Sequence, residues 1–130
     1  MIVADTTFLI DLQKGRRSDR HRVAADWIRA NPHEQVFIPA IVLGEYAEGF
    51  DDPDHPLMQH IRNSHPILPA DASVALRFGS IARLLRAGGR LIGTNDIWIA
   101  ATALVHEAPL LTRNVTHFTR VPGLQVINYA

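Results

Sequence analysis

The chain contains no cysteine, only one lysine and no long apolar run. Without cysteine, neither a disulfide framework nor thiolate ligation of a metal is available, and this absence suits a reducing cytoplasm. No apolar stretch approaches the ~20 residues of a membrane-spanning helix, so we expect no membrane association. The start, MIVADTTFLIDL, is interrupted by Asp5 and Asp11 and lacks a basic leader. We therefore do not expect it to act as a signal peptide.

Net charge is also lacking, because 13 lysine and arginine residues balance 13 aspartate and glutamate residues. This balance argues against a strongly basic nucleic-acid-binding protein. The cations are nearly all arginine, whose planar guanidinium suits phosphate, although genomic base composition explains the same bias. A dense basic cluster follows the first acidic segment: Lys14, Arg16, Arg17, Arg20, His21 and Arg22. A solvated loop is the simplest interpretation of this cluster.

What the chain does have is a regular alternation of strand-like and helix-like segments within 130 residues, a length that fits one domain over residues 1–130. Turn signals separate these segments. We expect strands at 2–4, 35–39, 66–69, 108–112 and 124–128, and helices at 7–12, 21–30, 40–50, 56–62, 72–89 and 96–105. Short apolar strands that alternate with helices predict an α/β fold. Its central, mostly parallel sheet should have about 4–5 strands, with helices on both faces.

Four polar residues fall where such a fold binds ligands, beyond the carboxyl ends of its strands. Asp5 directly follows the strand at 2–4, and Asn114 follows the strand at 108–112. Asp96 begins the helix that leads into this second strand. Glu45 lies early in the helix after 35–39, which opens with apolar residues. These groups are far apart in sequence, yet the topology can bring them to one edge of the sheet.

Each of these residues also has a simpler structural explanation. Asp5 can cap a helix, Asp96 can favour a helix dipole, Glu45 can face solvent, and Asn114 can serve a turn. If three carboxylates do converge, two charges ~5 Å apart repel by about 3 kcal/mol at an effective dielectric of ~20. The site must then hold a proton, an arginine or a cation, and hard oxygen ligands suit Mg²⁺ or Mn²⁺.

Histidine ligation is not expected, because the seven histidines show no metal-ligand spacing. We interpret His117 as a turn or surface residue. Trp98 lies off the apolar stripe of its predicted helix, so it either reaches an interface or packs against a neighbouring helix.

Four segments carry a resemblance to a known family. They are ADTTFLIDL (4–12), GEYAEG (44–49), NDIWIAATAL (95–104) and LLTRNVTHFTRVPGL (110–124). In this order and spacing they resemble the PIN-domain ribonucleases, and within them the VapC-type toxins of toxin–antitoxin pairs. The match covers essentially the whole chain, and the third and fourth segments are the more specific ones.

The resemblance implies a PIN-like fold and a metal-dependent endoribonuclease. Asp5, Glu45 and Asp96 match the three acidic residues that hold the catalytic Mg²⁺ or Mn²⁺, with Asp5 and Asp96 as its principal ligands. Asn114 matches a fourth position that is often aspartate, and this departure removes one negative charge. Thr6 matches a hydroxyl position near the metal.

The resemblance also implies partners: an RNA substrate, a VapB-like antitoxin that directs an arginine or lysine towards the acids, and a second copy of the chain in a homodimer. We expect the loop with Lys14, Arg16, Arg17 and Arg20 to guide the RNA backbone. Two other functions compete with this one. A phosphoryl-accepting signalling domain with Asp5 as acceptor needs a late lysine, which the chain lacks. A non-catalytic PIN-like binding module would leave the acids without a role.

Overall fold

The computed structural model of the chain describes residues 1–15 and 22–130. Its strands are β1 (Ile2–Ala4), β2 (Val36–Pro39), β3 (Ile67–Leu68), β4 (Leu110–Thr112) and β5 (Val126–Asn128). They form one sheet in the order β3-β2-β1-β4-β5, and every pairing between neighbours is parallel. This confirms the predicted parallel sheet. Because parallel strands cannot be joined by a tight hairpin, helical segments must connect them.

The helices that make these connections are α1 (Thr6–Lys14), α2 (Arg22–Ala30), α3 (Ala40–Ala47), α4 (Pro56–Ser64), α5 (Ala72–Ala87), α6 (Thr94–Val105) and α7 (Val115–Phe118). The six predicted helices are present. The short α7 was not expected, because four residues are too few to show a helical period. The start of α6 was predicted two residues too late: Gly93 is its N-cap, so Asp96 lies within the first turn.

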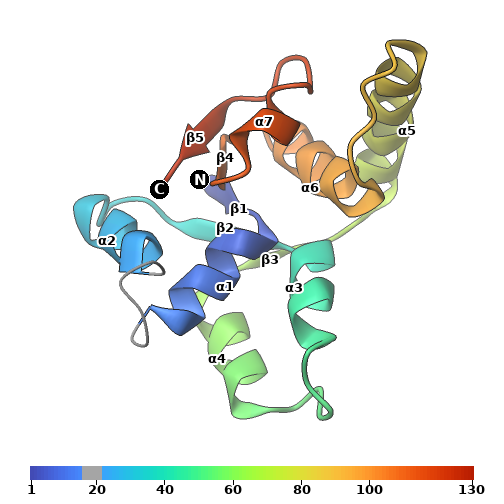
Figure 1. The fold of residues 1–130 in the computed structure, drawn as a ribbon. Helices are drawn as coiled ribbons and strands as arrows, with labels where there is room; N and C mark the ends of the chain where they lie inside the picture. Colours follow the sequence, from blue (N-terminus) through green and yellow to red (C-terminus); the bar gives the residue numbers. More distant parts are fainter. Residues whose placement is uncertain (16–21) are drawn as a thin grey trace.

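The strand order places β1 in the centre of the sheet. From β1 the chain adds β2 and then β3 towards one edge of the sheet. It then crosses back over the sheet to add β4 and β5 on the opposite side of β1. Figure 1 shows α1 and α2 on one side of the strands and α5 and α6 on the other. The reversal between β1 and β4 is the position at which open α/β sheets bind ligands.

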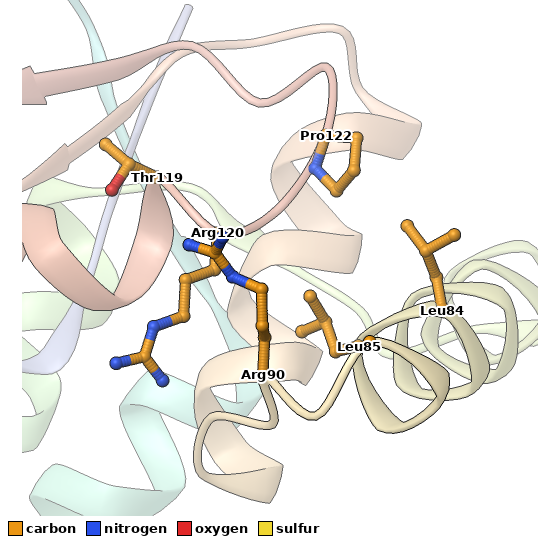
Figure 2. A pocket seen from close by; sticks show the side chains of 7 residues that line it. Leu84, Leu85, Arg90, Thr119, Arg120 and Pro122 are labelled. Atoms are coloured by element: carbon orange, nitrogen blue, oxygen red, sulfur yellow. The ribbon is translucent and has the colours of Figure 1, made fainter.

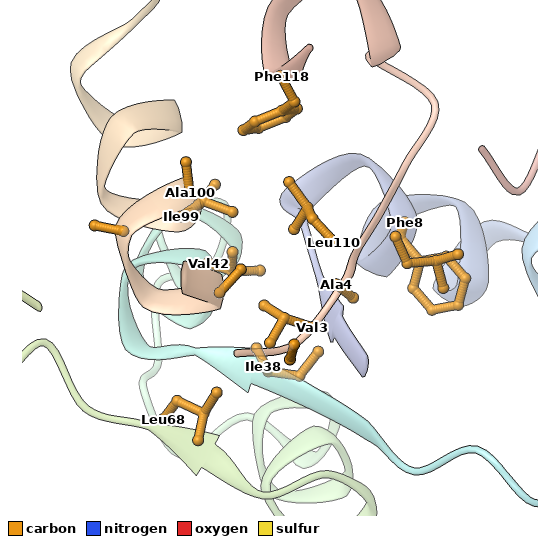
Figure 3. Close-up of a cluster of buried hydrophobic side chains, with 14 of the residues drawn as sticks. Val3, Ala4, Phe8, Ile38, Val42, Leu68, Ile99, Ala100, Leu110 and Phe118 are labelled. Atoms are coloured by element: carbon orange, nitrogen blue, oxygen red, sulfur yellow. The ribbon is translucent and has the colours of Figure 1, made fainter. Parts of the chain in front are cut away.

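The core is built around the two central strands. Ile2, Val3 and Ala4 of β1 are at most 1% exposed, and Leu110 and Leu111 of β4 are fully buried. Figure 3 shows Val3 and Leu110 with helix side chains around them, among them Val42 from α3. Continuous apolar strands of this kind are expected where helices cover both faces of a parallel sheet.

Helix α6 is buried on most of its circumference, at Ile97 and at every position of 99–103. Trp98 is only half-buried. Its ring stacks on that of Phe78 in α5, with centroids 4.4 Å apart and an interplanar angle of 23°. Of the two roles considered for Trp98, this contact supports packing against a neighbouring helix.

Across the described residues, no helix combines the length and the apolar character that a bilayer crossing requires.

Candidate active site

Asp5 lies at the point where β1 ends and α1 begins, and it is the N-cap of that helix. Its carboxylate accepts hydrogen bonds from the Phe8 backbone N–H at 2.9 Å and from the Thr7 hydroxyl at 2.8 Å to each oxygen. A third donor is the hydroxyl of Thr112, at the end of β4. Asp5 is 3% exposed. The capping role is therefore real, and it holds the carboxylate at the edge of the sheet.

Strand pairing explains why Thr112 reaches Asp5. Ala4 of β1 pairs with Leu111 of β4, so the next residue of each segment, Asp5 and Thr112, lies beside the other. The Thr112 hydroxyl also accepts a hydrogen bond from the backbone N–H of Asn114 at 2.8 Å. Thr112 thus links Asp5 to Asn114. It was not among the predicted site residues, although its place at a strand end beside Asn114 was a usable signal.

Glu45 reaches the same edge from α3. It is half-buried, and its Oε1 atom accepts a hydrogen bond from the Thr6 hydroxyl at 2.6 Å. Thr6 is the first residue of α1, directly after Asp5. The alternative in which Glu45 simply faces solvent is wrong. The hydrogen bond from Thr6 to Glu45 was not predicted, because Thr6 was expected only as a hydroxyl near the metal.

Asp96 lies in the first turn of α6 and faces His117 of α7. Its Oδ2 atom is 3.5 Å from Nδ1 of His117. The same ring nitrogen is 2.9 Å from Nδ2 of Asn114. The His117 side chain is 45% exposed, so its predicted surface position is correct. Its contact with Asp96 was not predicted. Residues three apart on a helix share a face, so its position beside Asn114 is the expected one.

The acidic side chains influence one another electrostatically. Burial raises the pKa of Asp5, and the charge of Asp96 raises it further, while hydrogen bonds from Thr112, Phe8 and Thr7 oppose the rise. Burial likewise raises the pKa of Asp96, and the charge of Glu45 adds to it, while His117 acts in the opposite direction. The negative charges of Asp5, Glu45 and Asp96 are therefore close enough to disfavour one another.

These residues fit a hard divalent cation in their chemistry. Between residues 1 and 15 and from 22 to 130, no three His, Cys, Asp or Glu side chains form a ready-made metal cage. Mg²⁺, however, usually keeps several waters and binds through one or two carboxylates. Asp5 already accepts from three donors, which leaves its carboxylate room for about one further partner. Burial is the main reason why the pKa of Asp5 and of Asp96 is raised, and a cation at this edge would offset the smaller part that comes from neighbouring negative charge.

The predicted basic residues are only partly described. Lys14 is exposed and ends α1, at the opposite end of the helix from Asp5, so the two are separated by about 13 Å of helix. Arg16, Arg17, Arg20 and His21 lie outside the described residues. Because Lys14 is the only lysine, its position also leaves Asp5 without the lysine that a phosphoryl-accepting domain requires.

A second network, centred on the buried Asp11, contacts the segments that carry the site. Asp11 of α1 is 3% exposed and accepts a hydrogen bond from the Tyr129 hydroxyl at 2.6 Å. Nε of Arg113 lies 3.4 Å from the same carboxylate, and its guanidinium lies 5.8 Å from the centre of the Tyr129 ring. Arg113 stands between Thr112 and Asn114. The network therefore joins α1, the segment after β4 and the residue that follows β5. These contacts were not predicted, because the residues are far apart in sequence.

Comparison with known proteins places this geometry in a family. The PIN domain family model matches residues 2–124. Ribonuclease VapC1 of Rickettsia felis is 30% identical over 134 residues, which cover 97% of this chain and 94% of that protein.

Two solved structures agree with this match. VapBC-1 from nontypeable Haemophilus influenzae superposes with a TM-score of 0.80 at 29% identity, covering 99% of this chain and 98% of the other. A toxin–antitoxin complex from Klebsiella pneumoniae gives a TM-score of 0.75 at 27% identity, with 100% and 98% covered. With the whole chain matched in sequence and in fold, the protein belongs to the PIN-domain family and, within it, to the VapC group.

Proposed function

We propose that the protein is a Mg²⁺- or Mn²⁺-dependent endoribonuclease and the toxin of a VapBC-like toxin–antitoxin pair. The observation that supports this most directly is the approach of Asp5, Glu45 and Asp96 at the switch point of the sheet. Burial raises the pKa of Asp5 and of Asp96, and the charge of Asp96 adds to the first rise and that of Glu45 to the second. The names of the relatives, ribonuclease VapC1 among them, support the same activity.

In this proposal Asp5 and Asp96 hold the cation. When bound, it lowers the pKa of a coordinated water and offsets the charge that develops on the scissile phosphate. Glu45, oriented by the Thr6 hydroxyl, receives the proton of the attacking water. The water oxygen bonds to phosphorus, the bond from phosphorus to O3′ breaks, and the O3′ atom takes up a proton from solvent. The products are a 5′-phosphate and a 3′-hydroxyl.

The other polar groups act by orientation. Thr112 and Thr7 fix the Asp5 carboxylate, and Asn114 with His117 fixes the side of Asp96 that faces α7. Partners of this kind hold a ligand in position without touching the metal. No side chain of the site needs to form a covalent intermediate.

The proposed partners follow from the family. We expect a VapB-like antitoxin whose cationic side chain neutralises the acids, a homodimer, and a cytoplasmic location in which RNA is available. The Haemophilus and Klebsiella structures are described as VapBC and toxin–antitoxin complexes, which supports the antitoxin. The basic segment of Lys14, Arg16, Arg17 and Arg20 stays a predicted guide for the RNA backbone.

The test is cleavage of total RNA by the purified chain with Mg²⁺, with Mn²⁺ or with EDTA, followed by mapping of the new ends. We expect metal-dependent cuts that leave 5′-phosphates, and their loss in Asp5→Asn and Glu45→Gln. Glu48→Gln is the matched control, because Glu48 is exposed at the end of the same helix as Glu45. Cleavage that persists in EDTA or in Glu45→Gln would refute the mechanism.

Calorimetry distinguishes the proposed enzyme from a non-catalytic module with the same fold. The proposed enzyme should bind Mg²⁺ or Mn²⁺ with a heat that disappears in Asp96→Asn. A module whose acids have no role should show no acid-dependent metal binding at all.

A further inference from the structure

A cavity of about 300 Å³ lies between the end of α5 and the chain that follows α7. Its lining contains two cations and no acid: Leu84, Leu85, Gly88, Arg90, Thr119, Arg120 and Pro122. Figure 2 shows the side chains of Arg90 and Arg120 next to each other, with leucines of α5 and Pro122 around them. Two like charges in one cavity disfavour each other, so an anion placed there would be stabilised by both.

The two arginines are positioned by backbone contacts and are not neutralised. The Arg120 guanidinium donates to the backbone carbonyl of Leu91 at 3.2 Å. The backbone N–H of Arg90 donates to the backbone carbonyl of Leu85 at 2.8 Å. No ion pair within the described ranges involves either arginine. Arg90 is exposed and Arg120 is half-buried, so a ligand from solvent can reach both. Guanidinium groups suit phosphate oxygens because they offer several donors in one plane.

Both arginines of the cavity lie close in sequence to residues of the acidic site. The backbone N–H of Arg120 donates to the carbonyl of His117 at 3.2 Å, so Arg120 lies one turn beyond the histidine that faces Asp96. Arg90 opens the short segment that leads through Gly93 into the first turn of α6, where Asp96 lies. Both arginines therefore lie on chain segments that adjoin residues of the acidic site.

We propose that Arg90 and Arg120 form a subsite for a phosphodiester of the RNA strand, next to the phosphate that is cleaved. This inference rests on the proposed ribonuclease function and adds a residue-level position for the substrate. The subsite explains how an acidic centre can bind a polyanion: the arginines hold the flanking phosphate while the acids act on its neighbour.

The test measures binding of a labelled single-stranded oligoribonucleotide by fluorescence anisotropy, in EDTA so that cleavage cannot interfere, over a range of salt concentrations. Each phosphate contact to a single strand contributes about 0.7 to the slope of log K against log salt. Arg90→Gln should make this slope shallower by about 0.7. It should also weaken binding about fivefold at about 0.1 M salt, since each phosphate contact adds about 0.7 to log K per tenfold dilution of salt from 1 M and the variant lacks one contact.

Arg83→Gln is the control, because Arg83 is exposed on α5, the helix that precedes Arg90, and does not line the cavity. It should leave the slope unchanged. Arg120→Lys keeps the charge and should keep the slope, whereas Arg120→Gln should lower it. Thermal unfolding of each variant establishes that it is folded, and Arg90→Gln removes no backbone hydrogen bond.

Two results would overturn the subsite. One is a wild-type slope for Arg90→Gln, and the other is an equal loss for Arg83→Gln. If the wild type cleaves RNA with Mg²⁺ and one of these results appears, only the subsite is refuted. If the wild type neither binds nor cuts RNA, the proposed function is refuted as well.

Discussion

Asp5 serves two purposes with one side chain. It caps α1 through the N–H of Phe8, and it presents a carboxylate at the edge of the sheet. Burial alone would push this carboxylate strongly towards its neutral form. The hydroxyls of Thr7 and Thr112 work against burial by donating to the charged form. An N-cap and a metal ligand are thus compatible roles for an aspartate that follows a strand.

Replacement of Asp96 by asparagine should stabilise the metal-free protein and abolish cleavage. Burial and the charge of Glu45 outweigh His117 in raising the pKa of Asp96, so its charge is unfavourable in the folded state at neutral pH. We expect the Tm of Asp96→Asn to rise by roughly 2–5 °C and its RNA cleavage to fall at least about 100-fold. Asp51→Asn, an exposed loop change, should alter neither. A lower Tm would instead support a purely structural role at the helix start.

The stability difference between Asp96→Asn and the wild type should depend on pH. The folded-state pKa of Asp96 is raised above 3.8, its value in an unfolded chain. This group therefore contributes stability that is fully present below pH 3.8 and is lost as pH rises through the raised pKa. The advantage of Asp96→Asn should be largest at neutral pH and should vanish on acidification towards pH 3.8. Unfolding curves of both proteins across this range measure it, and a constant difference would contradict the assignment.

Helix α1 is tied to other elements at two points along its length. Asp5 at its start is hydrogen-bonded to β4 through Thr112, and Asp11 in its second turn is hydrogen-bonded to Tyr129 after β5. Arg113 contacts Asp11 from the segment after β4. The orientation of the helix that carries Asp5 and Thr6 therefore depends on both strands of the C-terminal half.

Tyr129→Phe should loosen this attachment. Removal of a hydroxyl that donates to a buried carboxylate should lower the free energy of unfolding by about 1.5–3 kcal/mol. Denaturant unfolding measures the change. Tyr46→Phe is the control, because no hydrogen bond of the Tyr46 hydroxyl occurs in residues 1–15 or 22–130, and it should cost less. Equal effects in the two variants would show that Asp11 gains nothing from Tyr129.

The Phe78–Trp98 stack couples α5 to α6, the helix that carries Asp96. A double-mutant cycle with Phe78→Leu and Trp98→Leu should give a coupling free energy of about 0.5–1.5 kcal/mol in the folded monomer. The coupling should not change with protein concentration, since the contact lies within one chain. A coupling that grows with concentration would indicate that Trp98 acts at an interface between copies.

At the scale of the whole molecule, the fold brings three acidic side chains that are far apart in sequence to one edge of the sheet. The acids come from the starts of α1 and α6 and from the middle of α3, and the strand order brings these helices to the switch point between β1 and β4. The proposed arginine subsite flanks them on the side of α5 and α7. With the proposed subsite, this edge carries charges of both signs. The net charge of the chain is zero.

Divalent cations should stabilise the whole fold if they bind there. A free concentration ten times the Kd adds about 1.4 kcal/mol to the free energy of unfolding, which should raise the Tm by roughly 3–6 °C at neutral pH. Thermal unfolding with MgCl₂, against NaCl at equal ionic strength, measures the effect. The same titration of Asp5→Asn should show no rise. A rise that is equal in this variant would mean that the cation binds elsewhere.

The amino-acid sequence alone determined the class of fold and the candidate acids. Buried apolar strands, turn signals and helical spacing act over a few residues. These local patterns predicted a mostly parallel sheet of about 4–5 strands and six of the helices. Asp5 and Asn114 were recognised because they directly follow strands, and the resemblance of four segments named the family before any contact was known.

Only the tertiary structure decided which groups meet. Thr112 next to Asp5, His117 next to Asp96, and Tyr129 next to Asp11 join residues 107, 21 and 118 positions apart. No local pattern encodes such contacts, because strand order and register set them. The pKa of Asp5 and of Asp96 is raised for the same reason: burial and neighbouring charge exist only once distant segments have packed together.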